Sequence, residues 1–178
     1  MNQHPAAIPP NGRHRYTLRV YYEDTDAGGI VYHATYLRFA ERARTEALRD
    51  LDIPHADLLQ NFKLMFVVRR VEVDYLRPAR VDDSLVVETE VLEAGGASAT
   101  LRQTIHGPHG ACAVLRLRLA CVTAGGNAGS APDAGRPARL PPRWRAGLQA
   151  MHEARPAESA TGAADSGALE GVCGGSSS

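Results

Sequence analysis

The sequence predicts an α+β domain in which a curved antiparallel sheet of about five strands wraps around one long helix. Three observations predict it: an early alternating run of apolar and polar residues, then a single stretch with helical periodicity, then four more alternating runs with short connections. Short connections join neighbouring antiparallel strands, and a lone helix can cover one face of such a sheet. We therefore expect the helix to lie in the concave side of the sheet.

The first strand is predicted over 16–22, where "YTLRVYY" alternates in character. A helix is predicted from about Ala34 to Leu51, because apolar residues recur there at intervals of three and four. Pro54 ends it, since a proline disfavours helical backbone at the preceding residue, and "HADLLQ" adds a short helical turn. The apolar stripe of this helix is rich in alanine, which allows close approach to a sheet: Leu37, Ala40, Ala43, Ala47, Leu48 and Leu51.

Four strands are predicted after the helix, over 65–75, 85–91, 99–105 and 113–121. In the first of them, five apolar side chains are expected on one face, because they share one parity in the run: Met65, Val67, Val71, Val73 and Tyr75. Turn residues separate the later runs, as in "EAGGAS" and "GPHG". This alternation is typical of antiparallel strands with one face toward water.

The two ends of the chain differ in composition from the middle. Residues 1–14 are expected to be a flexible lead and 15–124 the folded domain. Residues 125–178 are rich in Ala, Gly and Pro, and are expected to be disordered apart from a short helix near 142–151.

Bulk composition excludes several classes of partner. The 178 residues carry a formal net charge of +0, which gives no general attraction to nucleic acid or to an anionic membrane surface. No apolar run approaches the length of a transmembrane segment, and the first residues lack the pattern of a secretory signal, so a cytoplasmic location is expected. Cys112 and Cys121 lie in one predicted strand, too far apart for a disulfide, and no cysteine or histidine cluster has the spacing of a zinc site.

The loop "YYEDTDAGGIVYHATY" is the strongest candidate site. Glu23, Asp24 and Asp26 precede a glycine pair, Gly28 and Gly29, and the predicted helix starts just after His33. The loop could be a plain turn, a calcium loop or a catalytic loop; ligand spacing argues against calcium, because the hydrophobic "IVY" stands where further ligands are needed. A carboxylate placed beside the free N–H groups of a helix start has the minimum equipment for acyl-group hydrolysis.

The stretch "YYEDTDAGGIVYHATYLRFAERARTEALR" resembles the acyl-CoA thioesterases of the hotdog fold, above all the Tol-Pal system-associated subfamily. It is more distantly similar to 4-hydroxybenzoyl-CoA thioesterase, and "FVVRRVEVDYLRPARVDD" is similar as well. The resemblance covers roughly Tyr16 to Thr123, and it implies a hotdog domain that hydrolyses an acyl-CoA thioester without a cofactor or metal ion. The C-terminal tail has no counterpart in it.

The resemblance also implies roles for individual residues. Asp26 corresponds to the family's catalytic carboxylate, acting as nucleophile or as general base, and the N–H of His33 corresponds to the group that polarises the thioester carbonyl. A helping role for the His33 ring and a catalytic role for Asp24 stay open, although Asp24 more naturally orients the loop through backbone hydrogen bonds. The expected substrate-binding residues are Gly28, Gly29, Tyr32, Tyr36, Arg69 and Arg70.

The resemblance implies a homodimer or homotetramer with acyl-CoA as substrate and acyl carrier protein as a further candidate partner. Two alternatives stay open. One is a hotdog hydratase or dehydratase acting on acyl thioesters. The other is a non-catalytic scaffold, peripheral to the inner membrane, that binds acyl carrier protein and partners in envelope maintenance or phospholipid synthesis. The acyl-chain preference is not fixed by the sequence.

Overall fold

The computed structural model describes residues 10–125 and 135–155. Five strands form one antiparallel sheet in the order β1-β3-β4-β5-β2. After a short 3-10 turn at Pro10–Gly12, their bounds are β1 Arg13–Arg19, β2 Leu64–Tyr75, β3 Ser84–Ala94, β4 Ser98–Gly107 and β5 Gly110–Thr123. The helices are α1 Thr35–Asp50, α2 His55–Phe62 and α3 Pro142–Glu153. The α+β architecture expected from the sequence is confirmed.

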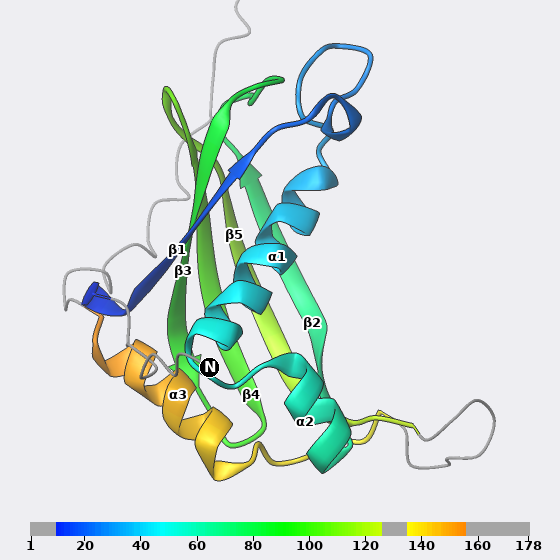
Figure 1. Cartoon of the computed structure of the whole chain (residues 1–178), viewed down its shortest axis with the longest axis vertical. Helices are drawn as coiled ribbons and strands as arrows, with labels where there is room; N and C mark the ends of the chain where they lie inside the picture. Colours follow the sequence, from blue (N-terminus) through cyan, green and yellow to red (C-terminus); the bar gives the residue numbers. More distant parts are fainter. Residues whose placement is uncertain (1–9, 126–134, 156–178) are drawn as a thin grey trace, which may run out of the picture.

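Helix α1 crosses one face of the sheet, and the sheet curves around it (Figure 1). Its predicted apolar stripe supplies the core, with Ala40 and Ala43 fully buried and Leu37 partly so. The small alanine side chains let the helix lie close to the strands. A first core cluster lies beneath the start of α1, and a second lies at its other end, where α2 and α3 join it.

A β-bulge divides β2 and corrects the predicted side-chain pattern of this strand. The pairing with β5 shifts between Val68 and Arg70, which leaves Arg69 as the extra residue. Directly paired antiparallel residues share a face, so Phe66 lies with inward-facing Cys121 and Val73 with inward-facing Leu115. Met65 and Val67 therefore lie on the opposite face from Val71, Val73 and Tyr75, because one added residue reverses the alternation.

The folded part of the chain extends beyond the predicted boundaries at both ends. Strand β1 begins at Arg13 and ends at Arg19, and the buried His14 ring lies 2.8 Å from the Asp50 carboxylate of α1. Helix α3 occupies the segment where a short helix was expected, but it packs into the second core cluster through Trp144, Leu148 and Met151. The predictions for 1–9, 126–134 and 156–178 lie outside the described residues.

Two further observations concern the described residues as a whole. None of their helices is both long enough and apolar enough to cross a bilayer. Cys112 and Cys121 are buried free thiols, and burial raises the pKa of each. Burial disfavours the thiolate form, so both cysteines behave as small core side chains.

Candidate active site

The acidic loop folds back on itself between β1 and α1. Thr25 and Val31 form an isolated antiparallel bridge, and the Asp26 N–H donates to the Ile30 carbonyl at 3.0 Å. Gly29 has a φ of 71°, a backbone conformation that side chains disfavour and glycine adopts freely. The loop is fixed to the connection between β2 and β3 because the Val31 N–H donates to the Ala79 carbonyl at 2.8 Å.

The structure separates the three acids of this loop. Strand β1 ends at Arg19, before the predicted boundary at residue 22, and Tyr22–Asp24 form a 3-10 turn. Asp24 is buried, and its Oδ2 accepts the Tyr21 N–H at 2.9 Å, which is the loop-orienting role expected from the sequence. Glu23 and Asp26 are both exposed.

Asp26 is held by the glycine pair but keeps an oxygen for other contacts. Its Oδ1 accepts the Gly28 N–H at 2.8 Å, and a Cβ at Gly28 would lie 3.0 Å from that oxygen. Glycine at this position therefore lets the backbone approach the carboxylate closely. Within residues 10–125 and 135–155, no hydrogen bond to Oδ2 of Asp26 is found.

His33 stands one residue before the N-cap of α1, Ala34. Its carbonyl accepts the Tyr75 hydroxyl at 2.9 Å, and its ring packs against Tyr32 with centroids 4.3 Å apart. No acceptor for its main-chain N–H is found among the residues described. Free N–H groups at a helix start carry positive potential, so this one can donate to an incoming oxygen.

The two tyrosines expected at the substrate differ in their surroundings. Tyr32 is 47% exposed beside the His33 ring. Tyr36 is 3% exposed, belongs to the first core cluster, and its hydroxyl oxygen accepts the Ala79 N–H at 3.2 Å. Burial raises the pKa of Tyr36, so its hydroxyl is neutral. This hydroxyl fixes the backbone at Ala79, whose carbonyl accepts the Val31 N–H.

Arg69 and Arg70 lie in the middle of β2, and a single chain does not bring them to the acidic loop. Arg69 is the exposed residue of the bulge. Arg70 pairs with Arg118 on the face of the sheet away from α1, and its guanidinium lies 2.5 Å from the Glu72 carboxylate. An exposed ion pair of this kind contributes little stability and leaves both side chains free to rearrange.

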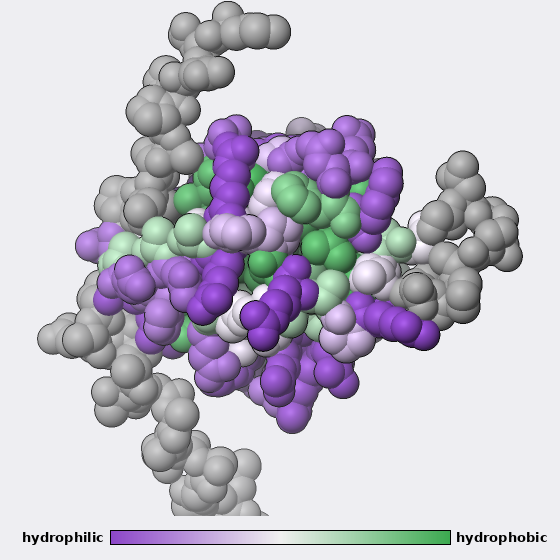
Figure 2. All heavy atoms as spheres, turned by 90° about the horizontal axis from the view of Figure 1, so that it is seen from below, coloured by the Kyte–Doolittle hydropathy of each residue, from purple (hydrophilic) through white to green (hydrophobic). Residues whose placement is uncertain are grey.

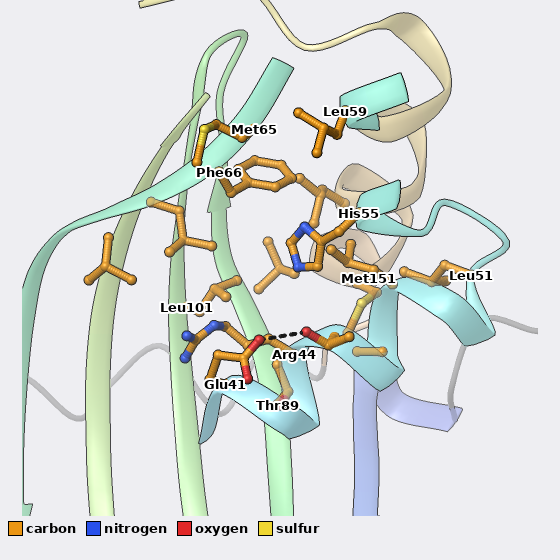
Figure 3. Close-up of a pocket in the computed structure, with 17 residues that line it drawn as sticks. Glu41, Arg44, Leu51, His55, Leu59, Met65, Phe66, Thr89, Leu101 and Met151 are labelled. Carbon is orange, nitrogen blue, oxygen red and sulfur yellow. Dashed lines mark hydrogen bonds between the residues drawn. The ribbon is translucent and has the colours of Figure 1, made fainter. Parts of the chain in front are cut away.

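Sequence reasoning missed a pocket beside the second half of α1. A pocket of about 510 Å³ lies between the second half of α1, α2, α3 and the sheet (Figure 3). Helices α2 and α3 lie at the opposite end of α1 from the acidic loop (Figure 1). We call this cavity the apolar pocket. Its size is typical of small-molecule sites, and apolar side chains line most of it, including Leu51, Leu59, Phe66, Leu101, Leu119 and Met151. The pocket joins segments far apart in sequence, so alternation and periodicity within single elements could not reveal it.

A few polar groups also line the apolar pocket. Arg44 donates from Nη1 to Oε1 of Gln103 at 2.8 Å, and the buried Gln103 donates from Nε2 to Ala40 O and Thr89 Oγ1 at 2.9 Å each. Burial lowers the pKa of Arg44 and that of His55, whose ring points into the pocket beneath Phe66 (Figure 3). The His55 ring is therefore neutral at pH 7, and the charged side chains of the lining are Glu41 and Arg44.

Apolar surface continues outside this cavity. Seen from the end where α2 and α3 lie, green apolar side chains gather in the middle of the surface with hydrophilic ones around them (Figure 2). Leu59 and Phe62 of α2 and Met65 of β2 are each more than 40% exposed, at 47%, 46% and 42%. No group of three or more metal-binding side chains occurs within the described ranges.

Comparison with known proteins agrees with this architecture. Residues 28–113 match the family model of the thioesterase superfamily. The acyl-CoA thioesterase YbgC of Haemophilus influenzae is 47% identical over 110 residues, which cover 62% of this chain and 81% of the relative.

Two solved structures are similar in fold and sequence. A probable thioesterase from Bartonella henselae is 34% identical with a TM-score of 0.63, covering 72% of this chain and 99% of that one. A thioesterase from Thermus thermophilus, complexed with coenzyme A and Zn, is 28% identical with a TM-score of 0.61, covering 80% and 95%. The resemblance to Tol-Pal-associated thioesterases is thereby confirmed, and the chain belongs to the thioesterase superfamily with a hotdog fold.

Proposed function

We propose that this protein is a thioester hydrolase that cleaves acyl-CoA to free acid and CoA, with Asp26 as the reacting carboxylate. One observation carries the assignment of the site. Asp26 is exposed, is held through one oxygen by the Gly28 N–H, and lies in the loop that leads into the His33 N–H at the start of α1. The activity itself is supported by the 47% identical acyl-CoA thioesterase and by the thioesterase that binds coenzyme A.

The chemistry follows from these two groups. The His33 N–H donates to the thioester carbonyl oxygen and stabilises the negative charge that develops there. As a general base, Asp26 takes a proton from water, the hydroxide bonds to the carbonyl carbon, and the C–S bond breaks with its electrons on sulfur. As a nucleophile, Asp26 bonds to that carbon itself, and water then hydrolyses the mixed anhydride. Either way the CoA thiolate leaves and takes up a proton.

The apolar pocket is distant from Asp26 of its own chain. At a rise of about 1.5 Å per residue, Arg44 at the pocket lies roughly 14 Å along α1 from Thr35 at the helix start. Figure 1 shows the acidic loop and α2 at opposite ends of this helix. One chain therefore separates its candidate catalytic group from the apolar pocket.

Strand β2 offers a way to bring the two together. Among the described strands it forms one edge of the sheet, and it carries exposed apolar side chains, among them Val68, Val71 and Tyr75. The other edge strand, β1, has 7 residues against 12 in β2. A sheet edge of this length and composition is a template for pairing with a second chain. We infer a homodimer in which two β2 strands pair antiparallel about a twofold axis.

Such pairing would place the acidic loop of each copy near the pocket of the other. The Tyr75 end of β2 contacts His33, while the Met65, Phe66 and Val68 end lines the pocket. A twofold axis through the middle of β2 brings the first end of one strand beside the second end of its partner. The acyl group would then occupy the pocket of one copy while Asp26 of the other copy meets its carbonyl.

Complementation between two inactive variants tests this arrangement. Asp26→Asn removes the charge, and Thr45→Trp fills the pocket from α1, where the Thr45 hydroxyl now donates to Glu41 at 2.8 Å. Each variant alone is expected to lose acyl-CoA hydrolysis. After subunit exchange at equal amounts, roughly a quarter of the sites regain an intact loop and an intact pocket, because random pairing gives mixed dimers with one complete site each.

Exchange is checked by native mass spectrometry, with free thiol as the activity readout. A mixture that forms mixed dimers yet stays inactive would show that the two parts of the site do not come from different chains. A Thr45→Trp variant with full activity would remove the apolar pocket from the proposal.

A further inference from the structure

The apolar pocket has an exposed mouth and a buried floor. Its exposed lining residues are Glu41 of α1, Leu59 of α2, and Met65 and Val68 of β2. On the opposite side its lining is buried, with Val91 and Leu101 from the sheet 1% and 4% exposed. The mouth of the pocket therefore lies on the β2 side, and the sheet forms part of its floor.

Helix α3 supplies part of that floor. Leu148 and Met151 line the pocket and are 6% and 2% exposed. They approach from a helix outside residues 28–113, the part of the chain that the superfamily model matches. The depth of the pocket thus depends on residues outside the part of the chain that the superfamily model matches.

Several contacts fix α3 in place, so its side chains form a firm end to the cavity. The Leu140 N–H, just before the helix, donates to the Gly96 carbonyl at 2.8 Å, and Trp144 is 1% exposed. A Cβ at Gly147 would lie 2.9 Å from Ile53 Cδ1, so glycine allows close packing there. At the other end, Arg155 donates to the Val91 carbonyl at 3.3 Å.

We propose that Leu148 and Met151 set the length of the acyl chain that this enzyme accepts, with the chain lying in the apolar pocket and its terminal methyl group against these two side chains. The lining suits a linear aliphatic chain, because Leu, Met and Val side chains surround it and the His55 ring is neutral. This inference rests on the proposed function, since it assigns the pocket to the acyl group of the same reaction.

Binding of neutral n-alkanols tests the pocket independently of catalysis. We expect the affinity measured by calorimetry to rise about fourfold per methylene group and to level off once the chain reaches the floor. Met151→Ala moves that plateau to longer chains because it removes volume from the floor, while Met151→Leu, which conserves volume, leaves it unchanged. Because Met151→Ala destabilises the fold when the cavity does not collapse, Met151→Val and Leu148→Val provide smaller deletions with the same expected direction.

The chain-length profile of acyl-CoA hydrolysis is then measured for each folded variant. The inference predicts that the dependence of kcat/KM on acyl-chain length shifts to longer chains in the same variants in which the plateau of alkanol binding does. The inference is overturned if the plateau of alkanol affinity stays at the same chain length in folded variants. It is also overturned if that plateau shifts while the chain-length profile of acyl-CoA hydrolysis does not change. Normal alkanol binding by a wild-type protein that hydrolyses no acyl-CoA, or whose hydrolysis does not depend on Asp26, would instead contradict the proposed function, so the two failures are distinguishable.

Discussion

Replacing Gln103 by methionine should strongly destabilise the fold, although the side chain keeps a similar volume. Gln103 is fully buried on β4 and connects the sheet to α1. Its amide accepts from Arg44 and donates to Ala40 O and Thr89 Oγ1, with all three distances between 2.8 and 2.9 Å. A thioether can replace none of these contacts.

The size of the loss follows from the groups left behind. A hydrogen bond to a charged group contributes about 1.5–3 kcal/mol, and each neutral one about 0.5–1.5 kcal/mol. The Arg44 guanidinium stays partly buried after the substitution, and burial already lowers its pKa. We therefore expect the free energy of unfolding to fall by roughly 3–5 kcal/mol.

Urea denaturation at fixed protein concentration measures this loss, because subunit association contributes to stability. Thr104→Val is the matched control: it alters a neighbouring polar side chain on the other face of β4 and should change stability by less than about 0.5 kcal/mol. The double variant Gln103→Met/Arg44→Met should lose about 1–2 kcal/mol less than the sum of the single losses. A loss under about 1 kcal/mol for Gln103→Met, or additive losses in this cycle, would refute the reasoning.

Two further predictions concern the acidic loop and the pocket. Asp24→Ala leaves the Tyr21 N–H without its acceptor, so it should lower the free energy of unfolding by about 1–3 kcal/mol and remove most of the hydrolysis. Asp24→Asn keeps an oxygen and should lower the stability less. Equal losses for the two variants in urea denaturation would contradict this. Burial lowers the pKa of His55, so the unfolded chain binds a proton first on acidification, and stability is lost as pH falls from about 6.5 through the lower folded pKa. His55→Gln removes this contribution, so the stability difference between wild type and variant should narrow at pH 5.5 relative to pH 7.5; a constant difference would argue against it.

Much of the fold could be predicted because the signals were local. The alanine-rich stripe from Ala40 to Ala47 has a single period, and it predicted the central helix and its buried face. The segments from Ser84 to Thr123 alternate regularly, so their strands and their antiparallel neighbours followed. The loop before α1 could be located because acids, glycines and a helix start stand together in the sequence.

The errors have a common physical origin in tertiary contacts. The bulge at Arg69 adds one residue to β2 and depends on pairing with β5, which no periodicity within β2 reveals. Helix α3 follows a segment rich in Ala, Gly and Pro, and its few apolar residues, Trp144, Leu148 and Met151, gain their importance only by docking on the second core cluster. The apolar pocket depends on both features and therefore escaped prediction.

The central claim, that the Asp26 carboxylate carries out the chemistry, is tested most directly by thiol release from acyl-CoA. Asp26→Asn keeps the shape of the side chain and should reduce kcat by about 10²–10⁴-fold. Glu23→Gln is the matched control, because it removes one charge from an exposed acid of the same loop and should leave the rate near that of wild type. Wild-type thiol release by a folded Asp26→Asn variant, or an equal loss in both variants, would contradict the account.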